Sequence, residues 1–109
     1  MTKAEFYEDG SHLLTGFELF GHTGYGECGS DIVCAAISAL TQAAANGITE
    51  VLGLKADIRV NEETGFLSVS VPEYRESGVQ VLLKTLRFSL DEIAKDYPGT
   101  IRIIFRERR

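Results

Sequence analysis

The stretch GSDIVCAAISALTQAAANG, residues 29–47, decides how this chain of 109 residues folds. It is rich in alanine, it opens with a serine and an aspartate that can cap a helix, and it closes with asparagine and glycine, which commonly end one. It therefore predicts a helix over 32–46 that ends at Gly47. No charged residue stands between positions 32 and 48, so we expect this helix to be largely covered. The residues predicted to form its buried face are Ile32, Ala36, Ala39, Leu40 and Ala43.

Alternating apolar residues predict two strand pairs, one on each side of this helix. Runs at 4–8 and 12–20 flank Asp9-Gly10, which is a strong signal for a hairpin turn. Runs at 54–60 and 66–71 are separated by turn-like residues, and the first of them reads as a half-buried strand. The sequence thus predicts two β-hairpins.

A second helix and a last strand complete the predicted fold. Apolar residues recur every three or four positions from 76 to 97 and stop at Pro98-Gly99, a pattern typical of an amphipathic helix. A final alternating run covers 101–105. The order β-β-α-β-β-α-β predicts a single α+β domain over 1–109, a two-layer sandwich with both helices on one face of a single sheet. The core positions predicted on the second helix are Val79, Leu82, Leu86, Leu90, Ile93 and Tyr97.

Composition limits the partners of the chain. Eleven Lys and Arg against sixteen Asp and Glu leave a net charge of -5, which argues against non-specific binding to nucleic acid or to an anionic membrane. The sequence has no uninterrupted apolar run of the roughly eighteen residues that span a bilayer, and its start lacks the apolar stretch of a signal peptide. We expect a cytoplasmic protein whose two cysteines, Cys28 and Cys34, are free thiols.

Residues 21–34 depart from what a purely structural domain needs. Four glycines between 21 and 30 predict a flexible loop, with His22 near its start and Cys34 in the first turn of the helix that follows. Unpaired backbone N–H groups at a helix start favour a thiolate, which is the nucleophilic form of cysteine. An imidazole opposite it can take the thiol proton. These residues predict cysteine–histidine catalysis.

Other interpretations of the same loop stay open on the residues alone. A cysteine in an alanine-rich helix is most often a small apolar residue. The loop lacks the GxxxxGK[ST] pattern of a phosphate site, and the spacing of its histidine and cysteines suits no standard zinc site, so we expect no cofactor and no metal. Cys28 could resolve a redox pair with Cys34, and Tyr25 could anchor the loop or contact a substrate.

A polar stripe runs along the first predicted helix. Asp31, Cys34 and Ser38 are three and four residues apart, so they are expected to share one helix face, which Thr41 continues. Exposed positions of a helix usually recruit lysine or glutamate instead. The stripe therefore indicates polar groups gathered beside the candidate nucleophile.

The segments GFE at 16–18, GHTGY at 21–25 and GSDIVCAAISAL at 29–40 closely resemble the ribosomal-processing cysteine protease family, called Prp. The resemblance extends over essentially the whole chain. It implies a bacterial cytoplasmic cysteine endopeptidase that removes the N-terminal extension of a large-subunit ribosomal protein. It also implies a homodimer, and apolar or aromatic residues before the cleaved bond. The alternatives are a non-catalytic, ribosome-associated interaction module and a thiol redox sensor.

The resemblance also implies roles for individual residues. By position His22 matches the catalytic histidine and Cys34 the nucleophile. Cys34 would attack the scissile carbonyl, amides of the helix start, including its own, would hold the oxyanion, and His22 would shuttle the proton. No residue that orients His22 can be assigned, because the spacing of Asp31, the candidate, equally suits helix capping or loop closure. The supporting positions of the family motif are Asp31, Ser38, Gly21 and Gly24.

Two loop residues depart from this pattern or lie outside it. Thr23 stands where alanine is common in the family, and we expect it to stiffen the loop without disturbing the two catalytic residues. Nothing carries over to Cys28, which falls in the variable part of the loop.

Overall fold

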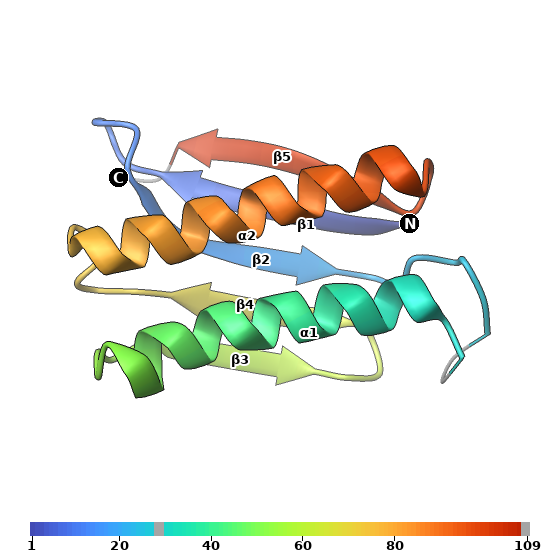
Figure 1. Cartoon of the computed structure of the whole chain (residues 1–109), viewed down its shortest axis with the longest axis horizontal. Helices are drawn as coiled ribbons and strands as arrows, with labels where there is room; N and C mark the ends of the chain where they lie inside the picture. The colour runs from blue at the N-terminus through green and yellow to red at the C-terminus, as the bar shows by residue number, and fades with distance from the viewer. Residues whose placement is uncertain (28–29, 108–109) are drawn as a thin grey trace.

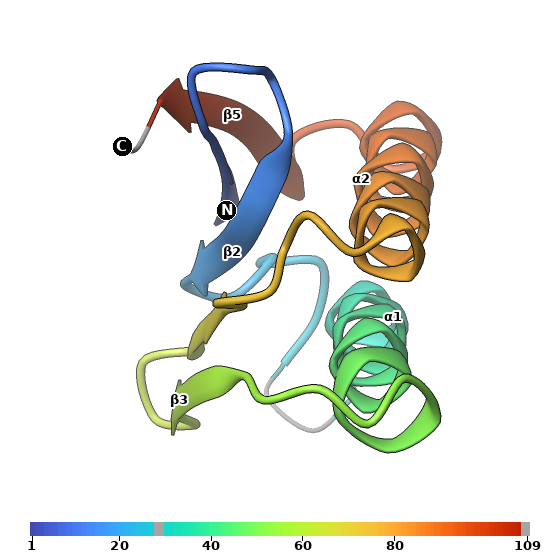
Figure 2. The same ribbon diagram turned by 90° about the vertical axis from the view of Figure 1, so that its left-hand side faces the viewer.

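The computed structural model describes residues 1–27 and 30–107. Five strands form one mixed sheet in the order β3-β4-β2-β1-β5, in which only β1 and β5 pair in parallel. Both helices cover the same face of this sheet (Figure 1, Figure 2). The predicted two-layer α+β fold is confirmed. Its elements in chain order are β1 (Thr2–Glu8), β2 (Leu14–Phe20), α1 (Ile32–Asn46), a π-helical turn (Gly47–Val51), β3 (Asp57–Asn61), β4 (Phe66–Ser70), α2 (Ser77–Asp96) and β5 (Ile101–Glu107).

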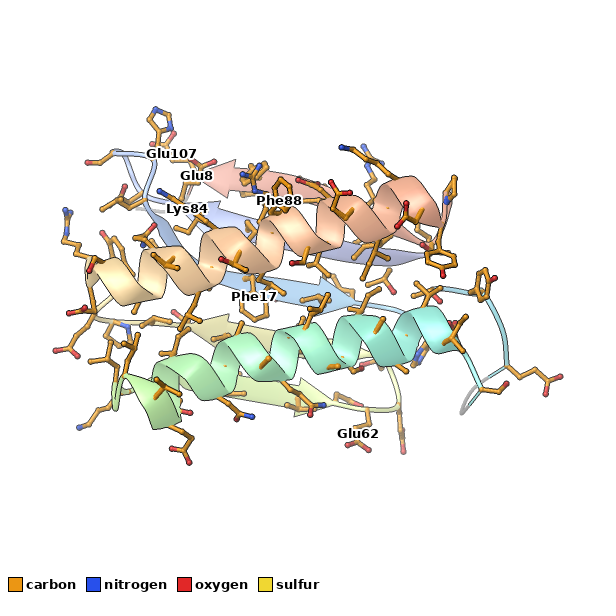
Figure 3. The ribbon with its side chains drawn as sticks, in the orientation of Figure 1. Glu8, Phe17, Glu62, Lys84, Phe88 and Glu107 are labelled. Carbon is orange, nitrogen blue, oxygen red and sulfur yellow. The ribbon has the colours of Figure 1, made fainter. Side chains whose placement is uncertain are left out.

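The core lies between the helix layer and the middle of the sheet. Phe6 of β1 and Phe17 of β2 are fully buried there, with ring centroids 5.9 Å apart. Phe17 is seen between the two helices in Figure 3. Burying one such side chain stabilises the fold by about 1.5–3 kcal/mol, so these rings fix the helix layer on the central strands.

Helix α1 has the predicted bounds but the wrong predicted face. Ile32 is 60% exposed, Ala36, Ala39 and Ala43 are exposed too, and Leu40 is only half-buried. The branched side chains of Val33 and Ile37 face the sheet instead, because they fill the interlayer space better than alanine does. A helix without charged residues is therefore not a covered helix in this chain. The buried positions of α1 are Val33, Ile37, Thr41, Ala44 and Ala45.

Gly47 was predicted to end α1, yet the helical path continues through it. Its φ of -58° is right-handed, and the chain makes one π-helical turn before Leu52. A Cβ at position 47 would lie 2.8 Å from Cδ1 of Leu82 on α2. The glycine therefore serves the close approach of the two helices rather than termination.

Helix α2 confirms most of the predicted core pattern. Val79, Leu86 and Leu90 are buried as expected, and Leu82 is half-buried. Leu83 was not predicted and is fully buried.

The edge strand β3 is shorter and more exposed than predicted. It begins at Asp57, and each of its residues is exposed, with Val60 at 61%. Ile58 pairs with the buried Val69 and so points to the helix side of the sheet. Strand β3 forms one edge of the sheet, and α1 is the helix that lies across from this edge (Figure 1, Figure 2).

By length and composition alone, the helical segment Ile32–Val51 is apolar enough to cross a membrane, the one such segment found in the described chain. One third of its most apolar window is buried, and core helices of globular domains pass the same test. The sequence was predicted to hold no such span because polar residues such as Thr41 and Gln42 interrupt its apolar run. Contact between α1 and the sheet accounts for the apolar character of the buried side of this helix.

Candidate active site

A hollow of about 310 Å³ opens between α1 and the β3–β4 hairpin. His22, Cys34, Ser38 and Gly21 line it, so four of the site residues predicted from sequence come together from a loop and a helix. Asp31 and Gly24 are not in the lining. The other lining residues are Thr2, Leu19, Ile37, Thr41, Gln42, Val60, Asn61, Glu62, Gly65, Phe66 and Leu67.

Cys34 is a half-buried free thiol in the first turn of α1. Ser38 and Thr41 follow it along the wall of the hollow, which confirms this part of the predicted polar stripe. The Thr41 hydroxyl donates back to the carbonyls of Ile37 and Ser38, at 3.0 and 3.1 Å. The Thr41 hydroxyl is thus satisfied within its own helix.

Asp31 lies outside the helix, as its N-cap, in an extended conformation. Its Oδ1 accepts the amides of Val33 and Cys34, both at 3.0 Å. A carboxylate here satisfies two of the amides that a helix start leaves unpaired. Asp31 thus fixes the turn that carries Cys34.

The Cys34 amide was expected to hold the oxyanion, and the structure contradicts this. That amide donates to Asp31, and the amide of Ala35 donates to the Asp31 carbonyl at 3.1 Å. A donor already bound to a carboxylate is not free for a developing negative charge. The oxyanion must be held by other groups.

The second oxygen of Asp31 reaches back into the loop. Oδ2 accepts the hydroxyl of Thr23 and, at 3.2 Å, the amide of Tyr25. The hydrogen bond from Thr23 is the first reason that the pKa of Asp31 lies below its ordinary value of 3.8, although burial opposes the shift. Thr23 is buried and ties the loop to the cap of α1, and its stiffening of the loop stays a prediction.

His22 is exposed and is held by the turn between β3 and β4. Its Nε2 lies 3.3 Å from the carbonyl oxygen of Glu63. The neighbouring Gly21 donates its amide to the Thr64 carbonyl at 3.2 Å and accepts the Thr2 hydroxyl at 3.1 Å. The β3–β4 turn therefore positions the histidine. Figure 3 shows Glu62, the residue before Glu63, at this end of the hairpin.

Gly65 permits the close contact between this turn and the loop that carries His22. It has a φ of +68°, and a Cβ on it would lie 2.7 Å from the Gly21 carbonyl oxygen and 3.3 Å from Cε1 of His22. The sequence predicts a turn at 61–65 but gives no sign of its contact with the histidine other than a glycine at the end of that turn.

Two glycines of the loop have backbone conformations that favour glycine. Gly21 and Gly24 have φ values of +80° and +72°, which favour glycine. The Tyr25 ring meets that of Tyr97, just after α2, edge to face at 5.3 Å. Tyr25 thus anchors the loop.

Cys28, for which a non-essential, a redox or a zinc-binding role was considered, lies outside the described residues. Over the described ranges, 1–27 and 30–107, no cluster of three or more His, Cys, Asp or Glu could hold a metal ion.

A free thiol and an imidazole line one hollow, at the edge of a two-layer α+β sandwich, and this arrangement is compatible with cysteine–histidine catalysis. The family model described as Cysteine protease Prp matches residues 1–102. The chain belongs to this family, and it is a cysteine peptidase.

Relatives and solved structures agree with this assignment. The chain is 28% identical over 94 residues to the ribosomal processing cysteine protease Prp of Bacillus subtilis, covering 83% of this chain and 84% of that protein. It is 30% identical over 86 residues to the ribosomal processing cysteine protease Prp of Staphylococcus aureus, covering 79% of this chain and 81% of that protein.

The fold is similar to that of the essential S. aureus protease Prp crystallised with a covalently linked product peptide. That comparison gives a TM-score of 0.91 at 26% identity, covering 97% of this chain and 100% of that one. The structure of the S. aureus protease with a substrate peptide gives a TM-score of 0.86 at 25% identity. That comparison also covers 97% of this chain and 100% of the other.

Proposed function

We propose that this peptidase removes the N-terminal extension of a large-subunit ribosomal protein during ribosome maturation. The relatives that support this are named ribosomal processing cysteine proteases, and the S. aureus protease has been crystallised with substrate and product peptides. The observation that carries the proposal is the common hollow of Cys34 and His22. It combines a nucleophile, a base and room for a peptide.

The proposed reaction is acyl transfer. His22 takes the proton of the Cys34 thiol, and the sulfur attacks the scissile carbonyl to form a tetrahedral intermediate. The C–N bond then breaks, and His22 returns the proton to the leaving amine. Water, deprotonated by the same ring, hydrolyses the thioester and frees the enzyme.

The shape of the hollow fits the expected residues before the cleaved bond. Leu19, Val60 and Leu67 line it together with Ile37, so its walls are mainly apolar away from the catalytic pair. Apolar or aromatic side chains of an extended substrate would leave water on binding these walls, which is favourable in proportion to the area buried. Glu62 at the rim adds a negative charge that suits a basic ribosomal substrate.

We also propose that the protein works in the cytoplasm and as a homodimer. A cytoplasmic site is where a reduced Cys34 and a ribosomal substrate would meet. The exposed apolar side of α1, formed by Ile32, Ala36, Ala39 and Ala43, supports self-association, since burial of such a surface is favourable. Light scattering on Ala39→Glu tests this: the wild type should be dimeric and the variant monomeric.

The direct test is cleavage of the extended ribosomal protein, followed by mass analysis. The wild type should release one N-terminal peptide, and Cys34→Ala and His22→Ala should leave the substrate intact. An uncut substrate with wild-type enzyme would favour the interaction module. Loss of activity on Cys28→Ser together with a Cys28–Cys34 disulfide under mild peroxide would favour the redox sensor.

A further inference from the structure

The β3–β4 turn meets the histidine through a main-chain group, and we infer that this group completes the catalytic array. We propose that the carbonyl of Glu63 orients His22, and that the Asn61 side chain holds this carbonyl in place. The inference rests on the roles proposed above for Cys34 and His22. It assigns the orienting partner of the histidine, which the sequence left undecided.

The first step concerns the proton on the imidazole. A carbonyl oxygen can only accept a hydrogen bond, so the 3.3 Å contact requires Nε2 of His22 to carry the hydrogen. In the neutral ring the lone pair then lies on Nδ1. Nδ1 is therefore the nitrogen that takes the proton of Cys34. When the ring becomes charged, the Nε2–H bond to Glu63 strengthens and stabilises the imidazolium.

The second step concerns the orientation of the carbonyl. Oδ1 of Asn61 accepts the amides of Glu63 and Thr64, at 3.1 and 3.4 Å. The Thr64 N–H and the Glu63 C=O belong to the same peptide group, and no peptide bond in the described chain is cis. In a trans peptide these two groups point in opposite directions. Asn61 thus holds the N–H on one side, and the C=O is directed to the other, where His22 lies.

The third step is the fit between the turn and the loop. The Gly21 amide donates to the next carbonyl, that of Thr64, so two successive carbonyls of the turn bind two successive residues of the loop. Gly65 keeps this contact free of a Cβ that would reach 2.7 Å from Gly21. Asn61 is the side chain that shapes the turn, which makes it the positioning residue.

The test compares Asn61→Ala with Asn61→Asp, which keeps an oxygen in the same place. Asn46→Ala serves as the matched control, because Asn46 is exposed at the end of α1 and is not in the hollow. Steady-state cleavage gives kcat and KM for each. Long-range ¹H–¹⁵N correlation spectra of the neutral ring, recorded with Cys34→Ala in place, report which nitrogen of His22 carries the hydrogen. His12→Gln identifies the His22 signals, since His12 lies outside the hollow.

We expect His22 to be protonated at Nε2 in the otherwise unaltered protein and to become a mixture of tautomers in Asn61→Ala. The same variant should lose up to about a hundredfold in kcat with little change in KM, as misplacement of a catalytic group does. Asn61→Asp should restore both readouts, and Asn46→Ala should match wild type.

Three results separate failure of this inference from failure of the proposed function. Protonation of His22 at Nδ1 in the protein that carries Cys34→Ala alone would overturn the role of the Glu63 carbonyl, whatever the cleavage rates of the variants. An unchanged tautomer and an unchanged kcat in Asn61→Ala would overturn the role of Asn61. Full activity of His22→Ala would overturn the proposed base itself.

Discussion

Cys34 and His22 face the same hollow but are held in opposite ways. Cys34 lies in a regular helix whose first turn is capped by Asp31, three residues away. His22 is exposed on a glycine loop, and its ring contact is to Glu63, 41 residues away in sequence. The proposed nucleophile is placed by local structure, whereas the proposed base is placed by a contact between distant segments. Changes in the β3–β4 turn should therefore reach the proposed base, while the helix start that carries the proposed nucleophile stays in place.

The largest effect should come from removing the nucleophile. Cys34→Ala and Cys34→Ser should lower the cleavage rate by roughly a thousandfold or more, because both remove the thiol that forms the proposed acyl-enzyme. Thermal unfolding should shift little, since Asp31 caps the helix through the backbone of position 34. A variant that retains cleavage would mean that Cys34 is not the nucleophile.

Gly65→Ala should reduce activity next most, by roughly tenfold to a hundredfold, because its Cβ displaces the carbonyl of Gly21 and with it His22. Gly53→Ala is the matched control: its φ of +67° is almost the same as the +68° of Gly65, but nothing lies within 4 Å of its added Cβ. Gly53→Ala should lose about 1 kcal/mol of unfolding free energy in urea titrations, and Gly65→Ala should lose more because of its clash with the Gly21 backbone. Equal cleavage rates for the two variants would show that the turn does not position the base.

Asp31→Asn tests the nucleophile side and its pH dependence. The pKa of Asp31 is lowered on folding, so the carboxylate stabilises the folded state above pH 3.8, and this contribution is lost as the pH falls through the folded-state pKa. The stability difference between wild type and Asp31→Asn should be full at pH 7 and shrink below about pH 4. Urea unfolding at both pH values measures it. A difference that stays constant with pH would contradict a role for the charge.

The smallest effect is expected at the outer end of the loop. Tyr25→Ala removes the edge-to-face contact with Tyr97, which is worth at most about 1 kcal/mol because Tyr25 is half exposed. Tyr25→Phe keeps the ring and should match wild type in thermal unfolding. Cleavage by both should stay close to wild type. A large loss of activity in Tyr25→Ala would assign this ring to substrate binding instead.

Prediction from sequence worked where the signal was local. The bounds of α1, its cap at Asp31 and the turn at Asp9-Gly10 follow from propensity and from hydrogen bonds between near neighbours. It was wrong for the face of α1, because alanine is tolerated equally well inside and outside a helix layer. It was also wrong for the exposure of β3, since an alternating pattern does not tell whether a strand is at the edge of its sheet.

The candidate site divides in the same way. The sequence identified His22 and Cys34 but assigned the Cys34 amide to the oxyanion, whereas Asp31 binds that amide. It recognised the 61–65 turn without its purpose, because the group that contacts His22 is a main-chain carbonyl. Every residue has a main-chain carbonyl, so the sequence does not indicate which carbonyl makes a functional contact.

The sequence by itself determined that a cysteine begins a capped helix behind a glycine loop, since capping and helix propensity act over a few residues. Tertiary structure decided which side of α1 is buried, that β3 forms one rim of the hollow, and where the imidazole of His22 lies. These features depend on the free energy of side-chain contacts and hydrogen bonds between segments far apart in the chain, which no short stretch of sequence contains.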